Sequence, residues 1–219
     1  MRFYQLGLIL LLMVGMIPFS RAGEPVRCGL KKVDLKPLSP TDFSKYIGKG
    51  ADVQLTFTND DPKKPATQFN EYPLEVKNMK TKTACKIEGG IWLADKVYLG
   101  DGEKVIALEE GSGSNADLAF YDAATCKGIG KLDISGPKVS VTESRVVSEG
   151  ACEPYEKGGK KFGSCSPAAV YELGDHCRPI LQDKESRELT KKVYGVEFSK
   201  MSEIENPQTP QAKVIREIR

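Results

Sequence analysis

Residues 91–108 read IWLADKVYLGDGEKVIAL, and this stretch decides the fold class. Residues 91–93 and 96–99 are rich in aromatic and β-branched side chains, which favour strands. Residues 100–102, Gly-Asp-Gly, have the composition of a tight hairpin turn, and residues 105–108 return as a second apolar segment. We therefore predict an antiparallel hairpin at the centre of the chain.

Further strands are predicted on both sides of this hairpin. Val53, Leu55 and Phe57 alternate with polar residues, which is the period of a strand with one buried and one wet face. The same kind of segment recurs at residues 118–121, 129–134 and 139–147. Strands at this spacing, punctuated by glycine, indicate an all-β or β-rich fold. We expect an antiparallel sandwich or a barrel-like meander stabilised by disulfides, with short helical turns only.

One predicted turn resembles a motif of other β proteins. Residues 122–127, Asp-Ala-Ala-Thr-Cys-Lys, are similar to the Asp-x-x-Thr-Gly-Lys turn of β-propeller blades, with Cys126 in place of the glycine. A looser echo surrounds Cys85, but the Asp and Thr of the turn do not recur there. We interpret the similarity as shared turn chemistry and assign no family from it.

The first residues have the pattern of a secretory signal peptide. Arg2 precedes an apolar run over residues 6–16, which is too short to span a bilayer as a helix. Small residues flank a cleavage point after Ala22, so we predict a signal peptide at residues 1–22 and a mature chain from Gly23. No later segment is apolar enough to cross a membrane. We expect a periplasmic or secreted protein.

All six cysteines follow the predicted signal peptide: Cys28, Cys85, Cys126, Cys152, Cys165 and Cys177. An even number of cysteines in an oxidising compartment favours three disulfides. Metal or redox use is disfavoured because the chain has no Cys-x-x-Cys pair. We predict a bridge between Cys85 and Cys126, which occupy similar turn contexts, and one local bridge within Cys152, Cys165 and Cys177.

Composition divides the rest of the chain into two parts. Residues 23–182 are predicted to form a single β-rich, disulfide-stabilised domain, and residues 183–219 a charged C-terminal extension. The extension contains a candidate helix at residues 186–193, and a tail from about residue 205 is expected to be mobile. Once the predicted signal peptide is removed, basic and acidic residues are equal in number, which disfavours binding to nucleic acid.

Charged side chains cluster in two neighbouring regions. The acidic group comprises Asp101, Glu103, Glu109, Glu110, Asp117 and Asp122. We interpret it as a solvated face, with a cation site or a catalytic carboxylate pair as alternatives. The basic group comprises Lys77, Lys80, Lys82 and Lys86, which suit either an anionic polymer or the protection of an edge strand.

Catalytic motifs are absent from the sequence. His176 is the only histidine, and its sequence neighbours Asp175 and Cys177 do not by adjacency form a catalytic arrangement. Trp92, Tyr98 and Tyr121 are either core residues or contacts for a ligand or partner.

We therefore expect an exported, non-catalytic β protein with a binding or structural role in the cell envelope or exterior. The alternatives are a secreted hydrolase using carboxylates or His176, and an inhibitor of an exported enzyme. The expected partner is a protein or a polysaccharide. No cofactor or metal is expected.

Overall fold

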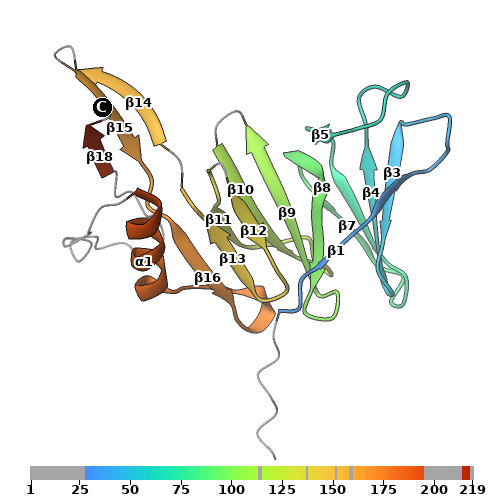
Figure 1. Ribbon diagram of the computed structural model, residues 1–219. Helices are drawn as coiled ribbons and strands as arrows, with labels where there is room; N and C mark the ends of the chain where they lie inside the picture. Colours follow the sequence, from blue (N-terminus) through green and yellow to red (C-terminus); the bar gives the residue numbers. More distant parts are fainter. Residues whose placement is uncertain are drawn as a thin grey trace, which may run out of the picture.

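The structure of the chain is a computed structural model that describes residues 28–112, 115–136, 138–150, 152–157, 160–194 and 214–217. Antiparallel β-sheets make up nearly all of the ordered elements, and one α-helix packs against them (Figure 1). The expectation of a β-rich, antiparallel fold is confirmed. The predicted signal peptide and most of the predicted tail lie outside the described residues.

A five-stranded sheet forms one side of the molecule. Its strands, in spatial order, are β2 (Leu35–Pro37), β3 (Lys45–Lys49), β4 (Val53–Thr58), β6 (Leu74–Asn78) and β7 (Ala84–Ile87). The alternation predicted for β4 is confirmed, because Val53, Leu55 and Phe57 are buried while the residues between them are partly exposed. The sheet therefore has one apolar inner face and one polar outer face.

A six-stranded sheet lies in the middle of the molecule. It contains β1 (Lys31–Lys32), β8 (Ile91–Gly100), β9 (Val105–Ser112), β10 (Asn115–Asp122) and β11 (Gly128–Asp133), with β5 (Gln68–Asn70) paired to the other end of β8. Gly100 of β8 lies opposite Val105 of β9. The central hairpin predicted from residues 91–108 is therefore confirmed.

Two smaller sheets complete the fold. One contains β12 (Val139–Val141), β13 (Arg145–Ser148), β16 (Ala169–Leu173) and β17 (Pro179–Leu181), and the other β14 (Cys152–Lys157), β15 (Lys160–Cys165) and β18 (Val214–Glu217). A short 3-10 turn, Asp175–Cys177, separates β16 from β17. Within the predicted mobile tail, only β18 is described, and the mobility of the rest stays a prediction.

The helix α1 (Asp183–Tyr194) confirms the helical segment predicted at residues 186–193 and extends it at both ends, so it is longer than the short helical turns expected for the fold. Its buried hydroxyls hold it against β16, since the Val170 amide donates to Ser186 Oγ at 2.9 Å and the Ala168 amide to Thr190 Oγ1 at 3.0 Å. The helix lies beyond the domain boundary predicted at residue 182. That boundary stays a prediction, although α1 packs directly on the four-stranded sheet.

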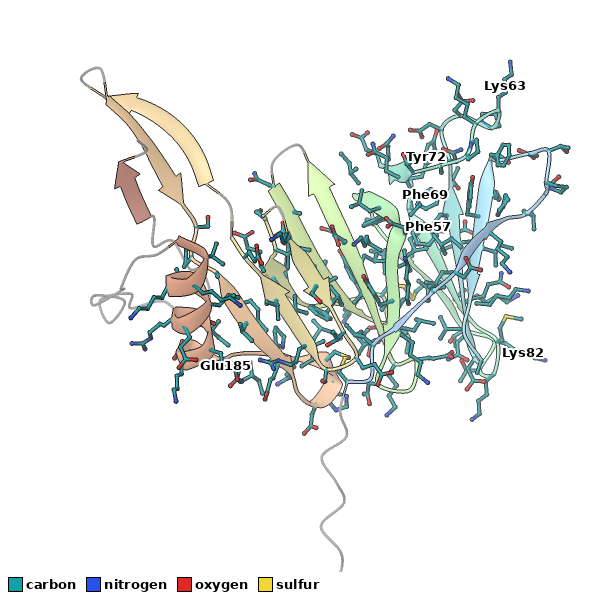
Figure 2. All side chains as sticks on the ribbon, in the orientation of Figure 1. Phe57, Lys63, Phe69, Tyr72, Lys82 and Glu185 are labelled. Carbon is teal, nitrogen blue, oxygen red and sulfur yellow. A yellow bond between two sulfur atoms is a disulfide. The ribbon has the colours of Figure 1, made fainter. Side chains whose placement is uncertain are left out.

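The six-stranded sheet is buried on both faces. Ile106 and Leu108 of β9 belong to a first core shared with the five-stranded sheet, and Val105 and Ala107 belong to a second core shared with the four-stranded sheet. Figure 2 shows two aromatic side chains of the first core, Phe57 and Phe69, whose stacked rings lie 4.6 Å apart. A middle layer needs apolar residues at successive positions, which explains the unbroken apolar run of β9.

Two disulfides join sheets to one another. Cys85 bonds to Cys126, with a Cα–Cα distance of 5.8 Å, and this predicted bridge is confirmed. Cys28 bonds to Cys177 across a sequence separation of 149 residues. The latter bond ties the segment before β1 to the turn that follows β16, so it links the N-terminal side of the fold to the four-stranded sheet.

The local bridge predicted within the last three cysteines is wrong for Cys177, because that residue bonds to Cys28. Chain folding brings the two residues together although they are distant in sequence. The β14–β15 register places the backbone of Cys152 opposite that of Cys165. A disulfide between Cys152 and Cys165 stays a prediction.

The turn between β8 and β9 connects the layers at one end of the stack, which we call the closed end. The carboxylate of Glu103 in this turn accepts hydrogen bonds from the backbone amides of residues 51–53, at 2.5 to 2.9 Å. On the other side, Asp101 contacts His176 of the 3-10 turn. Partial burial opposes ionisation of Glu103, but the three amide donors together lower the pKa of its carboxyl.

Candidate functional site

A row of polar side chains lies on the six-stranded sheet, on the face that carries the first core. Asp117 of β10 is directly opposite Glu110 of β9, and Lys131 of β11 is opposite Ala119 of β10. Tyr121 shares the face of Asp117 because side chains alternate along a strand. We call Glu110, Asp117, Tyr121 and Lys131 the shelf.

Glu110 is the centre of the shelf. Its Oε1 accepts hydrogen bonds from the Tyr121 hydroxyl at 2.6 Å and from Trp92 Nε1 at 3.2 Å. Its Oε2 lies 3.4 Å from Lys131 Nζ, which also contacts Asp117 Oδ2 at 2.8 Å. Four side chains from three strands, together with the indole of Trp92, therefore form one connected network.

The titratable groups of the shelf are coupled to one another. Burial and the bond to Glu110 raise the pKa of Tyr121, so its hydroxyl remains a donor at neutral pH. The hydrogen bond to Asp117 raises the pKa of Lys131, although partial burial opposes that shift. Each charged group of the shelf has a partner of opposite charge within the network. The side chains of Lys131 and Asp117 remain 54% and 31% exposed.

The three predicted contact residues lie in three different places in the structure. Trp92 is 1% exposed in the first core, and Tyr98 is 8% exposed in the second core, where burial raises its pKa to about 12. Tyr121 is half-buried on the shelf. A direct partner contact stays a prediction for these residues, and Tyr121 is the one with appreciable surface for it.

The single histidine has a partner that the sequence did not indicate. His176 Nδ1 lies 2.8 Å from Oδ2 of Asp101, whose side chain is only 4% exposed, and Lys104 Nζ lies 3.8 Å from the same oxygen. A histidine oriented by a buried carboxylate is one part of many hydrolytic sites. The neighbouring Cys177 is in a disulfide, and no hydroxyl of the described residues hydrogen-bonds the other ring nitrogen. We interpret the His176–Asp101 pair as a contact that stabilises the closed end.

The acidic residues grouped in the sequence do not gather in the structure. Asp101 and Glu103 act at the closed end, Glu110 and Asp117 belong to the shelf, and Glu109 is buried, which raises the pKa of its carboxyl. A single solvated acidic face is therefore a wrong description of this group. No set of three or more metal-ligating side chains is clustered within the described ranges.

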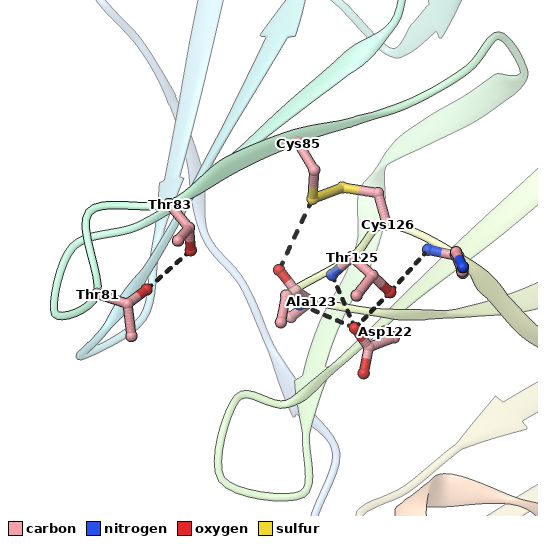
Figure 3. Close-up of a disulfide and its surroundings, with 9 residues drawn as sticks. Thr81, Thr83, Cys85, Asp122, Ala123, Thr125 and Cys126 are labelled. Carbon is pink, nitrogen blue, oxygen red and sulfur yellow. Dashed lines mark hydrogen bonds between the residues drawn. A yellow bond between two sulfur atoms is a disulfide. The ribbon is translucent and has the colours of Figure 1, made fainter.

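The sixth acidic residue, Asp122, organises the turn that resembles a propeller motif (Figure 3). Its Oδ1 accepts hydrogen bonds from the amides of Ala124 and Thr125 and from the Thr125 hydroxyl, and the hydroxyl bond is the main reason for its lowered pKa. Cys126 adopts a left-handed conformation, φ 58°, at the position where the motif has glycine. Its bond to Cys85 holds this turn against β7.

Comparison with known proteins assigns the family. A family profile described as "Immune protein Tsi1" matches residues 28–177. The chain belongs to the Tsi1 immune protein family. The immune protein Tsi1 of Pseudomonas aeruginosa strain PAO1 is 29% identical over 163 residues, which are 73% of this chain and 90% of that protein.

The part that matches Tsi1 begins at Cys28 and ends at Cys177, the two residues that form the long-range disulfide. The Tsi1-like part includes the five-stranded and six-stranded sheets and the shelf, whereas β17, α1 and β18 follow it. In the part of the chain that the structure describes, no helix is long and apolar enough to span a membrane.

Proposed function

We propose that this protein is an exported immunity protein that binds a harmful protein and blocks its action. The observation that carries the proposal is the match to the Tsi1 immune protein family across both disulfides and the shelf. The relative is named for immunity, and protection of a cell from a toxic protein requires recognition of that protein. Neither comparison supports the polysaccharide partner considered from the sequence.

Several features support action outside the cytoplasm. Two disulfides connect separate sheets, and such bonds persist in oxidising compartments. Residues 1–22 have the pattern of a signal peptide. We propose the periplasm or the cell exterior as the place where the protein meets its target.

We propose the shelf as part of the surface that contacts the target. Its side chains are partly exposed yet held in place by hydrogen bonds, so little conformational freedom is lost on binding. Tyr121 and Lys131 offer an aromatic ring and a cation, and Asp117 offers an anion. This mixture suits a protein surface carrying both charges.

The decisive experiment has two steps. The protein is first used to capture its partner from the exported fraction of its own organism, and the bound protein is identified. That partner is then expressed in the periplasm of a susceptible host with and without this chain. We expect growth to be restored only when the chain retains residues 1–22, and failure of the exported chain to protect would overturn the proposal.

The shelf is tested by Tyr121→Phe and Lys131→Gln, each of which should weaken partner binding about 10-fold, or about 1.4 kcal/mol. Lys127→Gln is the matched control, because this exposed lysine lies in the turn before β11 and outside the shelf. Unchanged affinity in both shelf variants, measured by calorimetry, would show that the target binds elsewhere.

A further inference from the structure

We propose that the outer face of the five-stranded sheet binds an anionic phospholipid surface, leaving the shelf free for a protein partner. The outward positions of this sheet carry five lysines, which we call the lysine face: Lys36, Lys45, Lys49, Lys77 and Lys86. All five side chains are exposed. The inference uses the proposed export of the protein but does not depend on the identity of its target.

Strand register brings these lysines onto one surface. Lys36 of β2 is opposite Ile47 of β3, which is opposite Thr56 of β4, and this row ends with Glu75 and Lys86. A second row contains Lys49, Gln54 and Lys77 on the next aligned positions of β3, β4 and β6. Neighbouring strands lie about 4.8 Å apart, so the two rows lie side by side on one face of the sheet, and Lys45, opposite Thr58, shares that face.

Few acidic side chains neutralise the positive charge of the lysine face. Glu75 is the acidic residue among the outward positions of the described strands of this sheet, and it lies 3.4 Å from Lys86. Lys36 contacts Asp34 at 3.4 Å in an exposed pair, which contributes little. Lys45, Lys49 and Lys77 have no ion pair among the described residues. The face therefore carries uncompensated positive charge on a chain that is close to neutral overall.

Protection of a sheet edge does not explain these three lysines. Edge strands often carry lysine because it prevents pairing with other chains. Lys36 and Lys86 lie on the edge strands β2 and β7 and fit that explanation. Lys45 and Lys49 lie on β3 and Lys77 on β6, and both of these strands are paired on two sides. What Lys45, Lys49 and Lys77 share is that all three lie on the outer face of the sheet.

The kind of cation favours a diffuse anionic surface. No arginine occurs between Cys28 and Ser144, so every cation of the lysine face is a flexible, strongly hydrated ammonium group. Specific protein contacts favour the planar, bidentate arginine, whereas lysines act additively at an anionic leaflet. Threonine, glutamine, one isoleucine and Glu75 lie between the lysines, and the outward positions of these described strands include no aromatic side chain to insert between lipids. The predicted contact is electrostatic and reversible.

The position of the patch is compatible with simultaneous protein binding. The inner face of the five-stranded sheet packs on the first core, so the lysines on its other face lie away from the six-stranded sheet; Figure 1 shows the two sheets next to each other. Lys82, in the turn that joins β6 to β7, extends the same side of the molecule toward the closed end (Figure 2). The shelf and the lysine face belong to different sheets, so the two contacts would use different side chains.

The test uses soluble protein purified from the exported fraction and sedimentation with vesicles. Vesicles of phosphatidylglycerol and phosphatidylcholine in equal parts are compared with vesicles of phosphatidylcholine alone. Each lysine near an anionic leaflet strengthens binding about fivefold, so the variant Lys45→Gln, Lys49→Gln, Lys77→Gln should bind the anionic vesicles about 100-fold more weakly. High salt should release the wild-type protein, because it screens charge.

The matched control is Lys127→Gln, Lys184→Gln, Lys192→Gln, which removes the same charge from exposed positions outside the five-stranded sheet. The control should keep its vesicle binding, and both variants should keep the wild-type melting temperature and partner capture. Equal loss in the two variants, or equal binding of wild-type protein to neutral vesicles, would overturn the proposal. Loss of partner capture in the first variant alone would assign the face to a protein instead.

Discussion

Replacement of Glu103 by glutamine should weaken the closed end without changing the volume of the side chain. Its two carboxylate oxygens accept three backbone hydrogen bonds, at 2.5 to 2.9 Å, from residues 51–53 of the five-stranded sheet. Glutamine keeps one acceptor oxygen and turns an amide donor toward another donor. Because the Glu103 carboxylate is only partly buried, we take the lower range for charge-assisted hydrogen bonds and expect a loss of about 1–2 kcal/mol in the free energy of unfolding.

For a chain of this size, that loss should lower the melting temperature by about 2–8 °C. The effect should depend on pH with a defined sign. Since folding lowers the pKa of Glu103 from its ordinary value of 4.5, its stabilising contribution is complete above that value. The contribution is lost as the pH falls through the folded-state pKa. Wild-type protein and Glu103→Gln should therefore differ at neutral pH and converge in acid.

The assay is urea unfolding followed by fluorescence over a series of pH values. Glu88→Gln is the control, because this exposed glutamate lies in the loop before β8 and makes no hydrogen bond among the described residues. The reasoning is refuted if the two variants lose equal stability at neutral pH. It is also refuted if the difference between wild type and Glu103→Gln stays constant into strong acid.

Three further changes have defined outcomes. Replacing both Cys28 and Cys177 by alanine removes a cross-link over 149 residues and should lower the free energy of unfolding in urea by about 3–5 kcal/mol. A loss below 1 kcal/mol would contradict a stabilising role for this disulfide. His176→Ala should lower the free energy of unfolding by about 1–2 kcal/mol, because the buried Asp101 loses one of its partners, but the variant should still capture its protein partner. A folded variant that no longer captures the partner would contradict this. Trp92→Phe should lower the free energy of unfolding by about 2 kcal/mol, because the core loses side-chain volume and one hydrogen bond. Thermal unfolding measures this loss, and an unchanged melting temperature would contradict it.

Local patterns in the sequence predicted much of the fold. Alternation identified β4, and the Gly-Asp-Gly turn identified the β8–β9 hairpin. Similar turn contexts predicted the pairing of Cys85 with Cys126. The three-layer arrangement was not predicted, although the unbroken apolar run in residues 105–108 is typical of a strand buried on both faces.

Long-range contacts account for what the sequence did not predict. The partner of Cys177 is 149 residues away, and the carboxylate that contacts His176 is 75 residues away. Nothing in the composition near either residue indicates these pairs, because folding alone brings the segments together. Glu110 belonged to an acidic cluster, but its role depends on a tyrosine and a lysine from two other strands. No local pattern in the sequence indicates that these three side chains meet in the folded chain.

The uneven distribution of cross-links gives the molecule a mechanical asymmetry. The two disulfides, the hydrogen bonds of Glu103 and the Asp101–His176 contact all lie near the closed end, and β9, with 8 residues, extends away from it. At about 3.3 Å per residue, a rotation of about 5° at the base would displace the tip of such a strand by roughly 2 Å. Glu110 and Asp117 lie near the end of β9 and β10 that is far from the closed end, so such a rotation would move the shelf further than any residue near the turn. Substitutions at the base would change how quickly a partner dissociates, even though they never touch it.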